Sequence, residues 1–287
     1  MAPLLIALGA SQQDMERIIG LKDRLSEDPT LPFRKSKNGR FRFDMEAGEI
    51  GRLEFQPFVL SHEEDFVRHD SGQLREFAEI GEDLQENTVL QALLRFQATV
   101  IEGVSVTPRP KLDYASRSWV CTVFHLLTIS TPDLIGEPAL EGVHADGVDH
   151  TMTTMLGSQN MSEDSAITFV HDNRERNGIP YSEADSQLIL GSCQHRHFLD
   201  TLLVVDHERK HSVSPVWAKD QVRAATRDML IFFTRKPTTP GHISHPYDGL
   251  ARHNHLPLSF VIRRDSDDRE HYPGRLRPHR HTSWTRD

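Results

Sequence analysis

Three side chains in this sequence have the types and spacing expected of a metal site. His144 and Asp146 are two residues apart, and His211 lies further along the chain after a short charged segment. Side chains two apart on an extended strand point to the same side, so His144 and Asp146 could bind one ion. Two imidazoles and one carboxylate on one face of an octahedron leave open positions, as in non-haem Fe(II) oxygenases. The pattern therefore predicts an iron site.

His207 is a second candidate for the third ligand, because it lies four residues before His211. That spacing suits a pair of ligands on a helix. The flanking sequence is instead typical of a strand followed by a turn, which favours His211. Further histidines near the C-terminal end have no recognised ligand spacing, and we interpret them as part of a solvated loop. These are His242, His245, His253 and His255.

Arg227 begins a second apolar, β-rich segment that follows the candidate ligands in the sequence. A guanidinium at the mouth of the same sheet could hold a carboxylate through two parallel hydrogen bonds. Arg223 could take this role, and Arg227 could instead pair with an acidic side chain at the end of a strand. We favour Arg227 as the group that binds a carboxylate near the metal.

The order of these motifs resembles that of the 2-oxoglutarate/Fe(II) dioxygenases that act on free amino acids. The likeness covers roughly residues 117 to 235, and it rests on the segments 142–149, 200–213 and 227–230. This family includes bacterial L-isoleucine dioxygenase and a fungal aziridine-forming enzyme that acts on L-valine. One departure is visible, since Ala145 stands between the two ligands where many bacterial relatives carry Gln.

The resemblance implies that His144, Asp146 and His211 bind Fe(II) within a double-stranded β-helix. It also implies that Arg227 binds the distal carboxylate of the co-substrate 2-oxoglutarate, and that O2 takes the last open position. The implied reaction oxidises a C–H bond of a free aliphatic L-amino acid similar to valine or isoleucine. The product would arise by C–N ring closure to an aziridine or by side-chain hydroxylation, as part of secondary metabolite biosynthesis.

A free amino acid needs polar partners for its ammonium and carboxylate groups, beside an apolar pocket for its side chain. We predict this role for polar residues in or next to the barrel strands. They are Arg117, Asp149, Thr153 and Asn160. Ordinary polarity at strand ends and turns would account for the same residues.

The composition favours an enzyme with a small-molecule substrate. A net charge of −9 over 287 residues gives no indication of the basic face expected of a nucleic-acid-binding protein. Only Cys121 and Cys193 are present, so no disulfide framework is indicated, and a reducing, cytoplasmic location is expected. The apolar run of residues 3–8 is short and has no basic leader, so we expect neither a signal peptide nor a membrane span.

The apolar patterning predicts a mainly β protein with flanking helices around a jelly-roll, cupin-like core. Helical spacing indicates helices within residues 11–26 and 74–102, and alternation around residues 40–60 indicates a hairpin. Short β-branched or aromatic segments predict the strands of the core. These segments are residues 116–128, 151–156, 166–171, 186–190, 201–205 and 227–233.

We expect a single catalytic domain over residues 1–235. Residues 1–115 would form an N-terminal support of helices and a hairpin, and residues 116–235 would form the β-helix core. Residues 236–287 are rich in His, Arg, Asp and Pro and predict a partly irregular C-terminal extension, with one strand-like piece at 258–262.

Two other classes of function fit parts of the pattern. A barrel metalloenzyme could use the same ligands for hydrolysis or isomerisation, and a metal-free module could bind a small molecule. Arg227 favours the oxygenase over the hydrolytic enzyme, because a co-substrate carboxylate gives its guanidinium a partner. The paired ligands His144 and Asp146 argue against a metal-free module.

Overall fold

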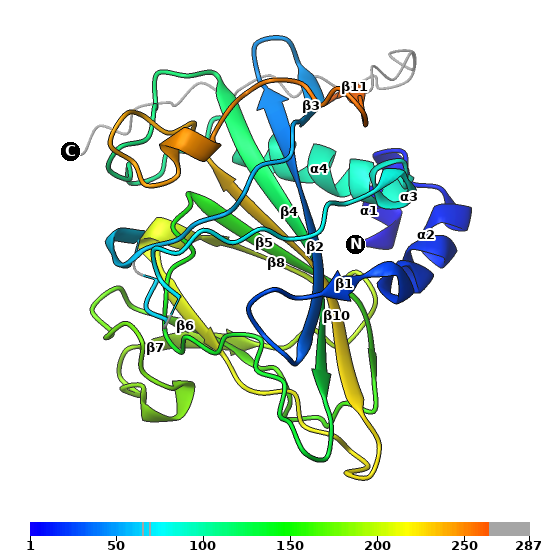
Figure 1. Ribbon diagram of the computed structural model, residues 1–287, viewed down its shortest axis with the longest axis vertical. Coiled ribbons are helices and arrows are strands. Elements are labelled where there is room, and N and C mark those ends of the chain that lie inside the picture. The colour runs from blue at the N-terminus through cyan, green and yellow to red at the C-terminus, as the bar shows by residue number, and fades with distance from the viewer. Residues whose placement is uncertain (65, 69, 264–287) are drawn as a thin grey trace, which may run out of the picture.

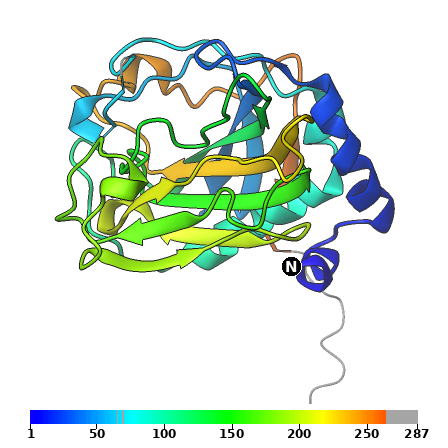
Figure 2. The same ribbon diagram turned by 90° about the horizontal axis from the view of Figure 1, so that it is seen from below.

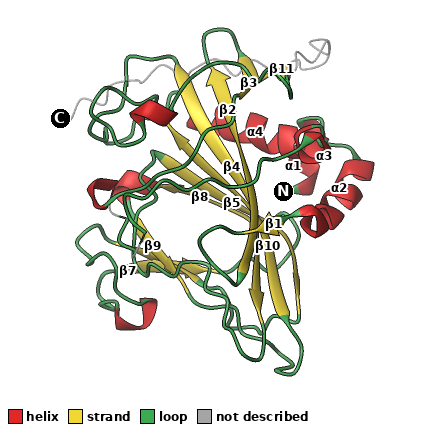
Figure 3. Ribbon diagram, viewed as in Figure 1, coloured by secondary structure: helices red, strands yellow, loops and turns green. Residues whose placement is uncertain are grey.

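The computed structural model describes residues 1–64, 66–68 and 70–263 of the chain (Figure 1). Two antiparallel sheets lie at its centre, and the main helices gather on one side of the larger sheet (Figure 3). This arrangement is a jelly roll, which confirms the mainly β fold predicted from the sequence. Of the partly irregular C-terminal extension expected over residues 236–287, residues 264–287 lie outside the described ones.

The larger sheet contains most of the strands. They are β1 (Ser26–Glu27), β2 (Arg34–Asp44), β3 (Glu49–Leu53), β4 (Ser118–Ser130), β5 (His150–Gln159), β8 (Thr201–Val205), β10 (Ala225–Arg235) and β11 (Ser259–Val261). Their order is β11-β3-β2-β4-β10-β5-β8, with β1 paired to the start of β2. The sheet therefore extends into both segments that we expected to flank the core.

The smaller sheet has the order β7-β6-β9. Its strands are β6 (Thr168–His171), β7 (Ile189–Cys193) and β9 (Lys210–Val213). Both β7 and β9 pair antiparallel with β6. Figure 1 shows this sheet on the side of the larger sheet that the helices leave free.

The helices pack against the outer face of the larger sheet, and Figure 2 shows the N-terminal ones beside the sheets. They are α1 (Ala2–Ala7), α2 (Gln12–Ile18), α3 (Glu82–Gln85) and α4 (Thr88–Ile101). The 3-10 helices are η1 (Ile19–Arg24), η2 (His62–Glu64), η3 (Tyr181–Glu183), η4 (Asp206–Glu208) and η5 (His245–Tyr247). Asn87 starts α4 by accepting the backbone N–H of Val89 at 2.9 Å. No helix in the described ranges has the length and apolar character needed to cross a membrane.

Alternation of side chains gives the larger sheet two different apolar faces. On β10, Leu230 and Phe232 belong to the core beneath the helices. Ile231 and Phe233 point the other way, into the space between the two sheets. Arg227 lines that same space, because it is an even number of residues away from them along the strand.

Most predicted core strands are present, although their ends differ. The segments 116–128 and 201–205 correspond to β4 and β8, and 227–233 lies within β10. The strand predicted at 186–190 begins only at Ile189, and β9 was not predicted at all.

The two predicted helical regions are only partly helical. The helix expected over residues 11–26 is divided into α2 and η1. In the region 74–102, helix begins only at Glu82, because the chain before it is extended and bound to β2. There the backbone N–H of Asn38 donates to the carbonyl of Ala78 at 2.9 Å, and Ile80 donates to Asn38 at 2.8 Å.

Candidate metal centre

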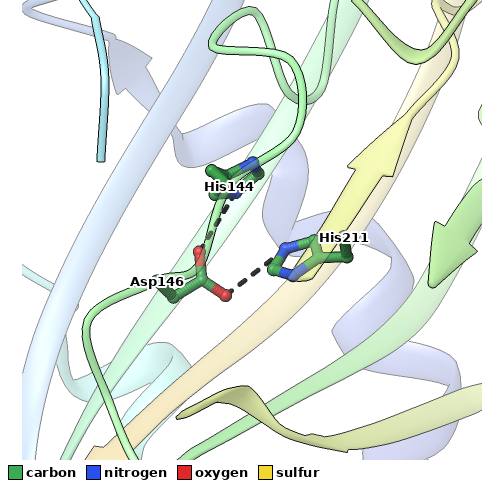
Figure 4. Close-up of side chains that lie close together, drawn as sticks. All are labelled: His144, Asp146 and His211. Carbon is green, nitrogen blue, oxygen red and sulfur yellow. Dashed lines mark ion pairs between the residues drawn. The ribbon is translucent and has the colours of Figure 1, made fainter. Parts of the chain in front are cut away.

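The three predicted ligands converge between the sheets (Figure 4). Nε2 of His144 lies 3.3 Å from Oδ1 of Asp146, and Nε2 of His211 lies 3.5 Å from Oδ2 of the same carboxylate. One ligand atom from each residue lies within 4.8 Å of those from the other two. Donor atoms bound at about 2.1 Å and at right angles around one ion are about 3 Å apart. Two imidazoles and a carboxylate at this spacing fit a divalent iron ion.

The backbone also joins two of these residues. His144 and His211 each donate their backbone N–H to the carbonyl of the other at 2.9 Å, which forms an isolated antiparallel bridge. His211 follows β8 and the turn η4, which matches the strand and turn predicted before it, and it lies itself in β9, which was not predicted. His144 and Asp146 lie in the loop before β5, with only this bridge, and not on the regular strand that we expected. The backbone bridge between His144 and His211 therefore fixes the position of this loop in place of the regular strand that we expected.

The imidazole of His144 is oriented by the backbone of its own loop. Its Nδ1 donates a hydrogen bond to the carbonyl of Gly142 at 2.8 Å, which leaves the lone pair on Nε2 available for a metal. Gly142 has φ of 76°, and a Cβ at this position would lie 2.1 Å from the carbonyl oxygen of Ile179. Glycine is therefore required for the turn that presents His144.

Asp206 holds the loop that contains Asp146. Both of its carboxylate oxygens accept the backbone N–H of Asp146 at 2.9 Å, and one accepts that of Val148 at 3.3 Å. Arg109 lies 3.5 Å from Asp206 and balances its charge. The hydroxyl of Thr151 donates to Oδ2 of Asp146 at 2.6 Å. Sequence reasoning missed Asp206, since its partners lie about sixty residues earlier in the chain.

Electrostatics in the site depend on burial and on neighbouring carboxylates. Burial lowers the pKa of His211 to about 4. Burial would also lower the pKa of His144, but the carboxylates of Glu141 and Asp146 outweigh it and raise that pKa to about 10. The same carboxylates would stabilise a bound cation, which takes the place of the proton on His144.

The ligand atoms open into a pocket between the sheets. Most of its wall is apolar, and the aromatic and aliphatic side chains that form this wall are Phe58, Leu60, Phe66, Phe124, Leu126, Leu202, Val204, Val213, Ile231 and Phe233. Charged side chains interrupt the wall at Arg34, Arg68, Arg75, Glu141 and Arg227. An apolar cavity with a few charged groups is typical of a site for a small, charged ligand.

Arg227 is 5% exposed and lies in this pocket. No carboxylate in the described part of the chain forms an ion pair with it, and its Nε has no hydrogen-bond partner there. Burial lowers the pKa of Arg227 to about 10, so the guanidinium remains charged at neutral pH. A buried, unpaired cation is costly, and a carboxylate ligand would remove that cost. Its alternative, Arg223, is exposed.

The structure brings only one of the four predicted substrate residues to the pocket. Thr153 lines it, and the hydroxyl of Thr153 lies 3.1 Å from Nε2 of His195. Ala145 is 3% exposed and is not part of the pocket wall. His207 lies in η4 and outside the cluster of ligand atoms.

Arg117, Asp149 and Asn160 lie away from this pocket. Arg117 lines a separate surface cavity. Asp149 is buried and accepts hydrogen bonds from the hydroxyl of Tyr114 and the backbone N–H of Lys236. The side-chain amide of Asn160 donates to the carbonyls of a neighbouring turn, including Asp220 at 2.8 Å. These contacts stabilise turns and strand ends, which is the ordinary role that polar residues have there.

The C-terminal histidines do not form one solvated loop. His242 and His253 are each only 8% exposed. Nε2 of His242 lies 3.2 Å from Glu64, and Nε2 of His253 lies 2.8 Å from Glu79. His245 is exposed, as is His255. Our interpretation was therefore wrong for the two buried histidines, which are paired with glutamates. Within the described residues, these histidines form no group able to hold a metal ion.

Comparison with known proteins gives a consistent result. Residues 21–233 match the family described as 2OG-Fe dioxygenase. The bifunctional enzyme flvA of Aspergillus flavus is 48% identical over 262 residues, which are 91% of this chain and 32% of that protein. The chain thus spans about a third of the length of this curated relative.

Solved structures with the same fold include the Fe(II)/α-ketoglutarate-dependent dioxygenase TqaL. It is 47% identical, with a TM-score of 0.78 over 91% of this chain and 87% of that one. A bsmA homolog from Methylobium petroleophilum PM1 is 18% identical, with a TM-score of 0.62 over 84% and 88% of the two chains. IDO from Bacillus thuringiensis is 12% identical, with a TM-score of 0.53 over 78% and 85%. The last two share the fold.

Proposed function

The chain belongs to the 2OG-Fe dioxygenase family, and on that premise we propose that it oxidises a C–H bond of a free aliphatic L-amino acid similar to valine or isoleucine. Enzymes of this family use Fe(II), 2-oxoglutarate and O2, and this protein is a non-haem dioxygenase of that kind. The proposed product is an aziridine formed by C–N ring closure, or a side-chain alcohol, within secondary metabolite biosynthesis.

His144, Asp146 and His211 would hold the iron, and Arg227 would bind the distal carboxylate of 2-oxoglutarate. When bound, the iron and 2-oxoglutarate would use O2 to supply the oxidising power that removes a hydrogen atom from a C–H bond, with succinate and CO2 as co-products. The protein contributes the position of both groups and an apolar wall that excludes water around them.

The observation that carries this proposal is the position of Arg227. Its buried guanidinium has no carboxylate partner in the described part of the chain and faces the same pocket as the three ligands. A hydrolytic metalloenzyme would not need a buried cation there, whereas a co-substrate with two carboxylates does. The apolar wall beside it suits an aliphatic side chain.

Mass spectrometry of the product tests the proposal directly. The protein is incubated with L-valine, Fe(II), 2-oxoglutarate, ascorbate and O2, with the His211→Ala variant as the control. A gain of one oxygen atom indicates hydroxylation, and a loss of two hydrogens without oxygen indicates ring closure or desaturation. The absence of succinate with every aliphatic L-amino acid would contradict the proposed substrate class.

A further inference from the structure

A second buried guanidinium faces the pocket of the metal centre. Arg75 is 6% exposed, and its Nε and Nη2 have no hydrogen-bond partner in the described part of the chain. Its Cζ lies 5.6 Å and 5.1 Å from the ring centroids of Phe58 and Phe66, so two aromatic faces cover it. Such a cation is available to an anionic ligand that enters the pocket.

The carboxylate beside Arg75 is already bound to another arginine. Arg68 donates to both oxygens of Asp70 from Nε and Nη2, each at 2.6 Å. Nε of Arg75 lies 3.9 Å from Asp70, which is beyond hydrogen-bond distance. The backbone of Arg75 is fixed by two hydrogen bonds with Phe58, each 2.8 Å long. The backbone is therefore held in place, while the side chain keeps its hydrogen-bonding capacity for a ligand.

Glu141 provides the opposite charge in the same pocket, and its side chain is 10% exposed. One oxygen lies 3.2 Å from Nε2 of His144, and the other lies 3.9 Å from Nη1 of Arg68. The carboxylate of Glu141 therefore lies beside the candidate metal centre and lines the pocket, where it can accept hydrogen bonds from a cationic ligand.

We propose that Arg75 binds the carboxylate of the amino-acid substrate and that Glu141 binds its ammonium group. This assignment rests on the proposed function, because it names the residues that would recognise such a substrate. The two opposite charges select a zwitterion, and the apolar wall accepts its aliphatic side chain. Since Glu141 is in contact with His144, the amine nitrogen lies close to the metal centre. Arg227 remains available for 2-oxoglutarate.

The test compares L-valine with two analogues, each of which lacks one of its two charges. L-Valine has both charges, L-valinamide lacks the carboxylate, and 3-methylbutanoate lacks the ammonium group. Binding to the anaerobic protein with Fe(II) and 2-oxoglutarate is measured by calorimetry. The wild-type protein should bind L-valine at least about tenfold more tightly than either analogue. Arg75→Leu should lose the preference over L-valinamide only, and Glu141→Gln should lose the preference over 3-methylbutanoate only.

Controls separate recognition from folding and from co-substrate binding. Arg75→Leu should keep the wild-type affinity for 2-oxoglutarate, and Arg75→Lys should recover part of the affinity for L-valine. The assignment is wrong if Arg75→Leu weakens 2-oxoglutarate binding instead, or if either variant keeps both preferences. A wild-type protein that binds none of the three ligands and forms no succinate with any aliphatic amino acid would overturn the proposed function, and this assignment with it.

Discussion

At the level of single residues, the three proposed metal ligands differ in how firmly they are oriented. His144 is held by the carbonyl of Gly142, and Asp146 by the hydroxyl of Thr151. Nδ1 of His211 has no hydrogen-bond partner in the described structure, although it lies 4.0 Å from Asp206. A hydrogen bond from Nδ1–H to a carboxylate commonly orients a metal-bound imidazole, and His211 does not form that bond in this structure.

Replacing His144, Asp146 or His211 by alanine should abolish iron binding and turnover and leave the fold intact. Two remaining ligands provide too little affinity and the wrong geometry for the ion. Bound iron and succinate formation are the measurements, with circular dichroism to confirm folding. His207→Ala is the matched control, because this nearby histidine lies outside the cluster. Loss of iron in His207→Ala together with retention in His211→Ala would show that the third ligand is misassigned.

Arg227→Ala should raise the KM for 2-oxoglutarate by at least about tenfold and leave iron binding unchanged. The reason is that the buried guanidinium would otherwise form a charge-assisted pair with the distal carboxylate. Arg223→Ala, in which an exposed arginine is removed, should behave like the wild type. An unchanged KM in Arg227→Ala would transfer the role to another cation of the pocket, such as Arg34 or Arg75.

At the level of elements, η4 supports the loop that carries Asp146, a proposed metal ligand. Asp206→Ala should weaken binding of Fe(II) by about 10–100-fold, because Asp206 accepts the backbone N–H groups that fix Asp146. Calorimetric titration of the metal measures the change. Glu208→Ala is the control in the same element, since Glu208 contacts Thr107 and not this loop. Equal metal affinity in both variants would mean that the loop holds its shape without Asp206.

The turn at Gly142 permits a second test at this scale. Gly142→Ala and Gly48→Ala both place a side chain in the left-handed region, at a cost of about 1–2 kcal/mol. Only at Gly142 would the Cβ meet backbone, whereas at Gly48 nothing lies within 4 Å. We therefore expect a larger loss of unfolding free energy and a weaker metal affinity in Gly142→Ala. If the two variants lost similar amounts of unfolding free energy and metal affinity, close packing of backbone around Gly142 would not be the cause.

The sequence indicated the elements that carry a local pattern. β4 and β10 contain long apolar runs rich in β-branched or aromatic residues, and the spacing of His144 and Asp146 is visible in one short motif. β9 was missed because it has only four residues and forms through pairing with β6, more than thirty residues earlier. Arg75, Glu141 and Asp206 were missed for a similar reason, since their roles depend on contacts that only the folded chain creates.

At the level of the whole molecule, Asp248 joins the C-terminal segment to the larger sheet. It forms ion pairs with Arg40 at 3.1 Å and with Arg235 at 2.9 Å, and its side chain is 2% exposed. Burial would raise the pKa of Asp248, but Arg235 and Arg40 outweigh it and hold that pKa below 3.8. A carboxyl whose pKa is lower in the folded state stabilises the protein above its unfolded pKa, and this contribution is lost as the pH falls.

Asp248→Ala should lower the free energy of unfolding by about 3–5 kcal/mol at neutral pH, because it removes the carboxylate partner of the buried Arg40 and of the half-buried Arg235. The difference between the variant and the wild type should shrink as the pH falls below about 4, because the carboxyl of the unfolded chain is protonated there and that of the folded protein only at its lower pKa. Urea denaturation at several pH values measures both effects. Asp172→Asn, which alters an exposed ion pair with Arg174, should change stability little. A difference that stays constant with pH would contradict the ionic origin.

The backbone bridge between His144 and His211 connects the smaller sheet to the loop that precedes β5. An ion bound by both side chains would add a second connection at the same point, so the two sheets could not separate there without breaking both. The ion would then link two segments of the chain that are separated by 66 residues, from 145 to 210. How long the protein retains its iron is therefore tied to the kinetics of local unfolding in the smaller sheet.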